Sequence, residues 1–282
     1  MTTEENSYVF DTESAVEMAR LINQDRLLTT AMGGPLSGVP ELPKNAQILD
    51  LGCGPGGWVL DVAYECPDAE VAGVDISNLM IEYANARARS QHLLNASFGV
   101  MNLRHPLDFA DASFDLVNAR LLVAALKREE WEPLLAECSR VLKPGGLLRM
   151  TEPVDFGVSN NQAYQQVMRL LSEALWKSGF GFSVDGRNYG LTNTLPGLFR
   201  AAGYQQVRIL AHALEFSAGT LGWQGMYDNY KAGVNVAPPL YVRAGLASAE
   251  EIVELYERVL LEMHSEDFRA MWHLVSVLGI KP

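Results

Sequence analysis

The chain has 282 residues, of which 48% are apolar and 20% charged, and its 34 acidic residues outnumber 22 basic ones, for a formal net charge of −12. This balance is typical of a soluble globular protein of one or two domains and excludes a fibrous or disordered chain. Neither half carries a basic run. The chain is therefore a poor candidate for binding nucleic acid or an anionic membrane surface, because both kinds of binding depend on Lys and Arg near phosphates.

Three cysteines, Cys53, Cys66 and Cys138, stand at unrelated spacings. They match neither a disulfide framework nor a zinc motif, so we expect a reducing compartment and no metal. The first residues are polar and acidic, unlike a signal peptide, and no apolar run approaches the ~18 residues of a membrane helix. These features predict a cytoplasmic location and no membrane association.

The first predicted element is a helix over residues 11–30, which Gly33, Gly34 and Pro35 bring to an end. After a loop rich in Gly and Pro, short apolar runs that predict strands alternate with helical patterns. The strand runs cover residues 47–51, 70–75, 115–118 and 146–151, and the clearest helical patterns cover 77–89 and 129–142. Such alternation predicts βαβ units around a parallel sheet with helices on both faces.

The rhythm loosens after Glu152, where the remaining predicted elements are helices at 161–178 and 192–202 and strands at 206–216 and 268–278. Between those two strands, Ser248-Ala249-Glu250-Glu251 is a capping box that starts another helix. The apolar stripe of this helix either packs on the core or forms a lid or a self-association face, and in the last case the chain would be a homodimer. The stripe comprises Ile252, Leu255, Tyr256, Val259, Leu260 and Met263.

Glycines crowd the turn that follows the first predicted strand, in the segment Gly52-Cys53-Gly54-Pro55-Gly56-Gly57. Glycine lets a ligand approach backbone that a Cβ would block, and the helix that follows offers unpaired N–H groups. Asp75 ends the next strand, 21 residues after Gly54, where a carboxylate can accept hydrogen bonds from both ribose hydroxyls. The residues alone therefore indicate an adenosine-containing ligand at the edge of a parallel sheet.

Two families fit that description. Gly52, Gly54 and Gly57 satisfy G-x-G-x-x-G, the dinucleotide fingerprint, which would make the chain an NAD(P)-dependent oxidoreductase. Tyr227 and Lys231 also match the Y-x-x-x-K of short-chain dehydrogenases. This pair lies far from where that family carries it and the glycine spacing differs too, so we interpret the Tyr and Lys match as accidental.

A whole series of segments more closely resembles the class I S-adenosylmethionine-dependent methyltransferases. Asp50-Leu51-Gly52-Cys53-Gly54-Pro55-Gly56 looks like their first motif, and Val74-Asp75-Ile76-Ser77 is similar to their second-strand acidic motif. The stretches 107–117 and 140–146 resemble the approaches to their fourth and fifth strands. These motifs occur in order within residues 46–153.

The resemblance implies a Rossmann-like α/β fold, with a seven-stranded, mostly parallel sheet, an antiparallel C-terminal strand and a helical cap. One methyltransferase domain would fill residues 1–282. Its expected parts are an N-terminal helical cap over 1–45, a cofactor-binding core over 46–216, a helical insertion over 217–266 that serves as a lid or dimer element, and the final core strand over 267–282.

The resemblance also implies how S-adenosylmethionine would be held, with S-adenosylhomocysteine as the product. Backbone atoms of the glycine loop would face the methionyl part, Asp50 would reach the ammonium group and Asp75 would hold the ribose. Ile76 would lie on the adenine ring, and Asn102 stands where the family usually carries Asp. The complete set of expected cofactor residues is Asp50, Gly52, Cys53, Gly54, Asp75, Ile76, Asn102, Leu103, Asn118 and Ala119.

A sulfonium methyl group is already activated, so its transfer needs an in-line nucleophile and a dry pocket, and a base only where the nucleophile must lose a proton. Glu152 and His105 are the candidates for that base. The segment after the predicted fourth strand lacks the D/N-P-P-aromatic turn that is usual in methyltransferases acting on exocyclic base or amide nitrogens. It also lacks the clustered acidic ligands that metal-dependent catechol-type enzymes need. We therefore expect a small organic acceptor that is methylated on oxygen, nitrogen or carbon. A member that binds the cofactor without transferring a methyl group is a further alternative.

The acceptor is expected to lie under a roof made from the N-terminal helix and the late insertion. Aromatic and Met side chains suit an apolar small-molecule pocket, although the same side chains also suit the core of a cap. The substrate or lid candidates are Tyr8, Arg26, Trp223 and Tyr227, accompanied by Arg20, Met226 and Tyr230.

Overall fold

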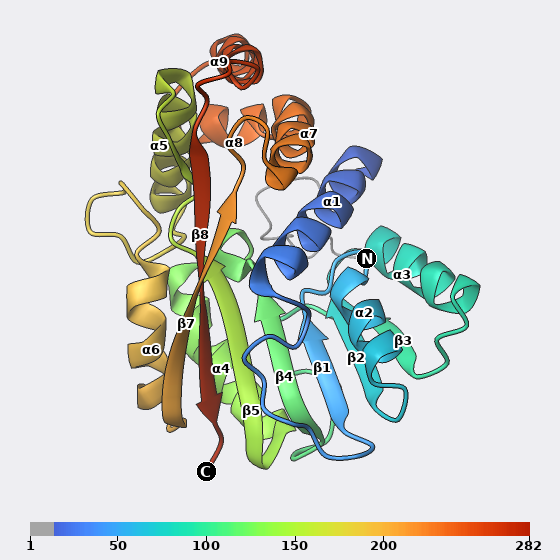
Figure 1. The fold of residues 1–282 in the computed structure, drawn as a ribbon. Coiled ribbons are helices and arrows are strands. Elements are labelled where there is room, and N and C mark those ends of the chain that lie inside the picture. Colours follow the sequence, from blue (N-terminus) through green and yellow to red (C-terminus); the bar gives the residue numbers. More distant parts are fainter. Residues whose placement is uncertain (1–13) are drawn as a thin grey trace, which may run out of the picture.

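Parallel strands form one half of the sheet in the computed structural model, which describes residues 14–282 (Figure 1). They are β1 (Gln47–Leu51), β2 (Glu70–Asp75), β3 (Ala96–Val100), β4 (Phe114–Arg120) and β5 (Leu142–Pro153). Their order is β3-β2-β1-β4-β5, and every neighbouring pair in it is parallel. The carboxyl ends of these strands therefore share one edge of the sheet, the upper edge in Figure 1.

The other half of the sheet is antiparallel and is organised by β8 (Ala270–Ile280). β8 pairs with β5, with β7 (Gln205–Glu215) and with the two-residue β6 (Val158–Ser159). The mostly parallel α/β sheet with an antiparallel C-terminal strand is thus confirmed. The sheet formed by residues 14–282 has eight strands rather than seven, because β6 is too short to leave a periodic pattern in the sequence.

The helices begin where a side chain can satisfy a free backbone N–H. Ser14, Ser77, Asn161 and Ser248 each accept a hydrogen bond from the N–H group three residues later, and Ser248 and Glu251 form the predicted capping box. The described helices are α1 (Ala15–Met32), α2 (Gly57–Glu65), α3 (Asn78–Ser90), α4 (Trp131–Val141), α5 (Gln162–Lys177), α6 (Leu191–Ala201), α7 (Leu221–Val236), α8 (Pro238–Arg243) and α9 (Ala249–Glu262), with short 3-10 turns η1 (Leu122–Ala124) and η2 (Arg128–Glu130).

The sheet separates two hydrophobic clusters, because successive side chains of a strand point to opposite faces. Ile48 packs with Trp58 of α2 on one face, whereas Leu49 packs with Trp131 of α4 on the other. All of these side chains are buried. Helices thus cover both faces of the parallel strands, as the uninterrupted apolar runs predict.

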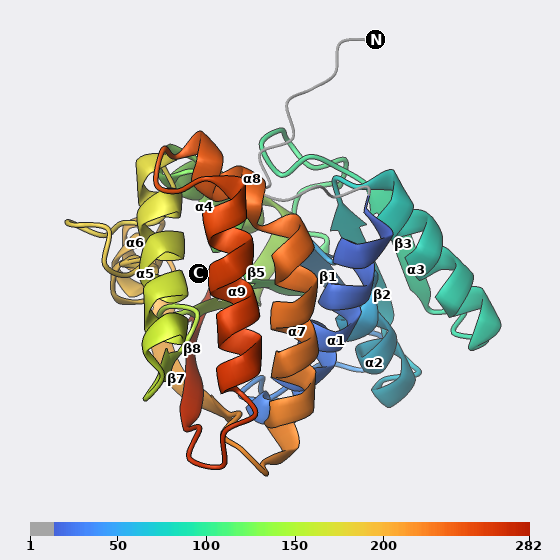
Figure 2. The same ribbon diagram turned by 90° about the horizontal axis from the view of Figure 1, so that it is seen from above.

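Four helices, α1, α7, α9 and α5, lie side by side over the carboxyl edge of the sheet (Figure 2). The apolar stripe of α9 faces inward: Leu260 is half-buried and the other five side chains are buried among α5, α7 and α8. The stripe is therefore internal packing and not a self-association face. Of the helices in residues 14–282, none is both long and apolar enough to cross a membrane.

Candidate functional site

A cavity that is partly open to solvent lies at the carboxyl edge of the sheet where β1, β2 and β4 end. We call it the first cavity. Asn118 and Ala119, two of the ten expected cofactor residues, are not in its lining and lie buried in β4. The eight expected residues that do line it are Asp50, Gly52, Cys53, Gly54, Asp75, Ile76, Asn102 and Leu103.

The glycine loop between β1 and α2 makes the floor of the first cavity. Gly52, Gly54 and Gly56 have φ angles of 67°, 53° and 78°, in the left-handed region that side chains rarely adopt. A Cβ on Gly57 would lie only 1.9 Å from Oδ2 of Asp25, so the glycine at the start of α2 lets α1 approach closely. The Asp25 carboxylate thereby faces the positive N-terminal end of α2, which favours a negative charge.

Asp75 fastens the glycine loop to the end of β2. One of its carboxylate oxygens accepts a hydrogen bond from the Gly54 N–H and the other from the Ser77 N–H, both at 2.9 Å. A carboxylate oxygen has more than one acceptor position, so Asp75 can also receive hydroxyl groups from the cavity side. The loop and the carboxylate are therefore placed relative to each other before any ligand arrives.

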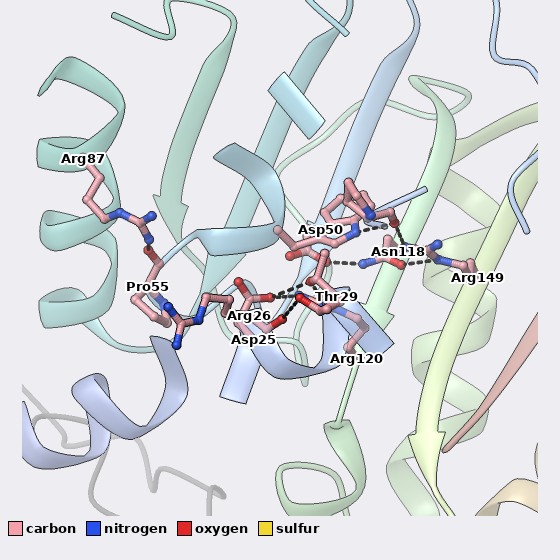
Figure 3. Close-up of polar contacts among 12 residues, drawn as sticks. Asp25, Arg26, Thr29, Asp50, Pro55, Arg87, Asn118, Arg120 and Arg149 are labelled. Atoms are coloured by element: carbon pink, nitrogen blue, oxygen red, sulfur yellow. Dashed lines mark hydrogen bonds and ion pairs between the residues drawn. The ribbon is translucent and has the colours of Figure 1, made fainter. Parts of the chain in front are cut away.

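Asp50 begins a buried chain of polar groups that runs across the sheet beneath the cavity (Figure 3). Asn118 Nδ2 donates to Asp50 Oδ1 at 2.6 Å, and Asn118 Oδ1 accepts from Arg149 Nε at 2.8 Å. The rest of the Arg149 guanidinium donates to the carbonyl oxygens of Pro35 and Ser37, at 2.6 and 3.0 Å. Asn118, which does not touch the cavity, therefore orients the Asp50 carboxyl that does.

Burial sets the charge state of both ends of this chain. Asp50 is 3% exposed, and loss of water raises its pKa to about 7, against the opposing effect of the Arg120 charge. Burial lowers the pKa of Arg149 to about 9, and the nearby Arg120 charge acts in the same direction. Asp50 is thus poised to gain or lose a proton near neutral pH, and a cation in the first cavity would favour its ionised form.

Asp25 and Arg120 close the first cavity from the α1 side. The Asp25 carboxylate forms an ion pair with Arg120, and the hydroxyl of Thr29 accepts from the same guanidinium at 3.1 Å (Figure 3). Gln24, Asp25 and Arg120 all line the cavity, and sequence reasoning assigned none of them a role. A helical pattern in the sequence identifies the apolar residues of α1. It does not show which charged residues of the helix contact the end of a distant strand.

A second cavity, smaller and also partly open, lies beside the first under α1, α7 and α9. The two share Gln24 and Leu121 in their linings, and the segment from Leu121 to Leu126 contributes residues to both. Most of the second lining is apolar or aromatic. It consists of Arg20, Gln24, Leu121, Val123, Ala124, Pro153, Phe156, Met168, Leu171, Met226, Asn229, Tyr230, Gly233, Val236, Ala237, Tyr256 and Trp272.

The polar groups of the second cavity are held by partners. Arg20 makes two hydrogen bonds to the buried Glu17 carboxylate, at 2.6 and 2.7 Å, and donates to Asn229 Oδ1 at 3.0 Å. Tyr230 shares a hydrogen bond with the hydroxyl of Tyr164. Burial raises the pKa of the Tyr230 hydroxyl above its ordinary value, so it stays protonated at neutral pH. The cavity is therefore uncharged apart from one neutralised Arg.

The two candidate bases lie outside both linings. Glu152 is fully buried at the end of β5, and its two carboxyl oxygens accept hydrogen bonds from the Leu122 and Val123 N–H groups, at 2.8 and 3.1 Å. Burial raises its pKa to about 8. His105 follows Asn102 on the loop after β3, and its backbone N–H donates to the Asn102 carbonyl at 3.0 Å.

The expected substrate and lid residues divide between the cavities and the outside. Arg26, Trp223 and Tyr227 line neither cavity. The Trp223 and Tyr227 rings stack on each other with centroids 5.1 Å apart and both contact the His264 ring edge-on. Tyr8 lies outside the described residues. Their neighbours Arg20, Met226 and Tyr230 do line the second cavity.

Comparison with known proteins connects this geometry to a family. Residues 48–146 match a family described as a methyltransferase domain. A secondary metabolism regulator laeA from Coprinopsis cinerea is 28% identical over 227 residues, which are 72% of this chain and 52% of that protein. The chain thus spans about half the length of this relative. A demethylmenaquinone methyltransferase from Geobacillus stearothermophilus is 27% identical over 193 residues, covering 65% of this chain and 81% of the relative.

Solved structures share the fold at lower sequence identity. Phosphoethanolamine N-methyltransferase 2 from Haemonchus contortus has been solved with S-adenosylhomocysteine and with S-adenosyl-L-methionine. Both structures match with a TM-score of 0.57 and 15% identity, covering 96% of this chain and 57% of theirs. The likeness at this identity concerns the fold.

Proposed function

The chain carries a class I S-adenosylmethionine-dependent methyltransferase domain, and on that premise we propose that it transfers a methyl group from S-adenosylmethionine in the first cavity to a small organic acceptor in the second. The observation that carries the proposal is the meeting of the two cavities at Gln24 and Leu121. A methyl donor and its acceptor atom must come within about 3 Å of each other in line. Cavities that share lining residues lie side by side, and the proposal requires that they open into each other beside Gln24 and Leu121 when both ligands are bound.

The residues of the first cavity fit this cofactor. Asp75 can hold the ribose, and the glycine loop offers backbone that no Cβ shields. The Asp50 carboxyl lines the cavity and can attract the positively charged ammonium group of the cofactor. Ile76 and Asn102 also line the cavity and can contact the adenine ring. When bound, S-adenosylmethionine would supply a methyl group on a sulfonium sulfur, and in-line attack of the acceptor atom on that methyl carbon would release S-adenosylhomocysteine. Asn118 and Ala119 support this site from within β4.

The second cavity defines what the chain contributes to the acceptor. Its described lining has no carboxylate and no imidazole, and burial raises the pKa of both of its tyrosines, Tyr230 and Tyr256, so their hydroxyls stay protonated at neutral pH. We therefore assign no general base among the described residues of this lining, and the acceptor atom would be nucleophilic by itself or lose its proton to water. Oxygen, nitrogen and carbon nucleophiles all remain candidates. The apolar walls favour a mainly apolar acceptor and exclude water from the reacting atoms.

The helices over the edge act as a cap in this proposal. α1 belongs to the N-terminal part over 1–45, and α7 to the insertion over 217–266. The two helices are joined tightly, since Asn23 Nδ2 donates to the Gly225 carbonyl at 2.6 Å. The parts over 46–216 and 267–282 supply the sheet that carries the glycine loop.

Two measurements test the function. Isothermal titration with S-adenosylhomocysteine and with NADH separates a methyltransferase from an NAD(P)-dependent oxidoreductase, and we expect heat only with the first ligand. A radiolabelled methyl transfer assay over small apolar phenols, amines and enolisable carbonyls then tests turnover. Binding of S-adenosylhomocysteine without transfer to any member of a broad panel would indicate a cofactor-binding protein that moves no methyl group.

A further inference from the structure

The wall between the two cavities contains a strained residue. Leu121 has φ 60° and ψ 34°, a left-handed conformation that a side chain with a branched Cγ rarely takes. Among the described non-glycine residues with positive φ, Leu121 is the one that lines either of these two cavities, and it lines both. Such strain persists only where the surroundings enforce it.

The end of β5 enforces it. The Leu121 N–H donates to the Thr151 carbonyl at 3.0 Å. The next two N–H groups, of Leu122 and Val123, donate to the two oxygens of the Glu152 carboxyl at 2.8 and 3.1 Å. Three successive backbone donors of the wall are therefore tied to two successive residues of one strand. Glu152 is fully buried and has no lining position in either cavity.

We propose that Glu152 is a positioning residue: its carboxyl clamps the turn at Leu121, Leu122 and Val123 and thereby sets the separation between the cofactor and the acceptor. This inference rests on the proposed function, because the wall matters only if a donor and an acceptor occupy its two sides. Glu152 does not touch either ligand and takes no proton from the acceptor. Its effect on transfer is geometric, and a displacement of about 1 Å in such a wall can cost a hundredfold in rate.

The proposal predicts a specific loss in cofactor analogue binding. Sinefungin carries an amine where the transferred methyl group would be, so its affinity reports on the wall, whereas S-adenosylhomocysteine carries nothing at that position. In Glu152→Leu we expect sinefungin affinity to fall about tenfold and S-adenosylhomocysteine affinity to fall less than about threefold. Glu152→Gln keeps the shape of the side chain and one acceptor oxygen, so its sinefungin affinity should lie between those of Glu152→Leu and the unmodified chain.

A double-mutant cycle with Leu121→Gly separates positioning from general support of the fold. Glycine adopts a φ of 60° without strain, so the clamp is no longer needed. We therefore expect adding Glu152→Leu to Leu121→Gly to change the ratio of sinefungin to S-adenosylhomocysteine affinity by less than about twofold. Losses that simply add in the cycle, or an unchanged ratio in Glu152→Leu and Glu152→Gln, would overturn the proposal.

Asp115→Asn is the matched control. Asp115 Oδ2 accepts from the Gln47 N–H at 2.8 Å and pairs with the Lys143 ammonium, so it clamps the backbone of β1 and a side chain of β5, but at the amino end of β4 and away from both cavities. Asp115→Asn should lower the melting temperature without changing the ratio of sinefungin to S-adenosylhomocysteine affinity. If the unmodified chain did not bind S-adenosylhomocysteine, the proposed function itself would be refuted. An unchanged affinity ratio in the Glu152 variants would refute only the positioning role, so the two failures are distinguishable.

Discussion

The two cavities are neighbours with a common wall, yet they are built in different ways. The first is made of the glycine-loop backbone and a mixture of polar and apolar side chains at the ends of adjacent strands, within residues 50–126, together with one face of α1. The second is made of large apolar side chains from elements as far apart as Arg20 and Trp272. The first kind of site is carried by contiguous motifs, and the second exists only once distant elements have packed.

The largest expected effect breaks the first cavity alone. Asp75→Ala should lower S-adenosylhomocysteine affinity about a hundredfold, because it removes the ribose acceptor and the anchor of the Gly54 and Ser77 N–H groups together. Isothermal titration measures this loss. Asp68→Asn, at an exposed position near the start of β2, is the control and should bind normally. A loss under threefold in Asp75→Ala would remove Asp75 from the cofactor site.

A second substitution addresses the second cavity alone. Met226→Trp should fill part of that cavity and lower methyl transfer to the best acceptor from the screen by more than about tenfold, with S-adenosylhomocysteine affinity within about twofold. Leu221→Trp on the same helix places the same ring at a fully exposed position and should be neutral. Equal losses of transfer and cofactor affinity in Met226→Trp would mean that the cavities do not have separate roles.

The pH dependence of cofactor binding sharpens the comparison further, because Asp50 belongs to the first cavity only. Its pKa of about 7 means that the carboxyl is mostly neutral at pH 6 and mostly ionised at pH 8. Binding of a cation favours the ionised form, so S-adenosylmethionine affinity should rise about tenfold from pH 6 to pH 8 and level off above. Titrations at several pH values measure it. Asp50→Asn should bind more weakly at pH 8 and show a flat profile.

The smallest effect concerns the helix that both cavities share. Asp25→Asn weakens the ion pair with Arg120 and the contact at the start of α2, which should destabilise α1 by about 1 kcal/mol, since the pair is partly exposed. Hydrogen exchange of residues 15–32 should accelerate severalfold and slow again when S-adenosylhomocysteine is added. Glu254→Gln, on α9, serves as the reference. Unaltered exchange in Asp25→Asn would show that α1 is held by its apolar contacts alone.

Sequence reasoning reached the fold and the first cavity because both depend on local patterns. The apolar runs at 47–51 and 70–75 became β1 and β2, and Ser77 caps α3 as expected. The strand β3 left no such pattern, since none of its residues is fully buried. The pairing of strands was reached through the family resemblance and not through the runs themselves.

The second cavity could not be predicted residue by residue. Trp223 and Tyr227 were expected near the acceptor, but they lie on the stripe of α7 that meets His264, while the neighbouring stripe with Met226 and Tyr230 faces the cavity. A helical pattern tells which residues share a stripe and not which of two neighbouring stripes meets a distant element. The hydrogen bonds of Glu152 could not be predicted for a similar reason, because its partners are backbone N–H groups about thirty residues away.

The place of β8 in the sheet has a consequence for biosynthesis. The strands β1 to β5 pair among themselves using residues up to 153, whereas β7 finds its partner in β8, which also supplies Trp272 to the second cavity. A growing chain can therefore assemble the half that holds the glycine loop while β7 still lacks a neighbour. The second cavity is completed only after residues 270–280 have left the ribosome, so under the proposed function the site for the methyl donor would form before the site for the acceptor.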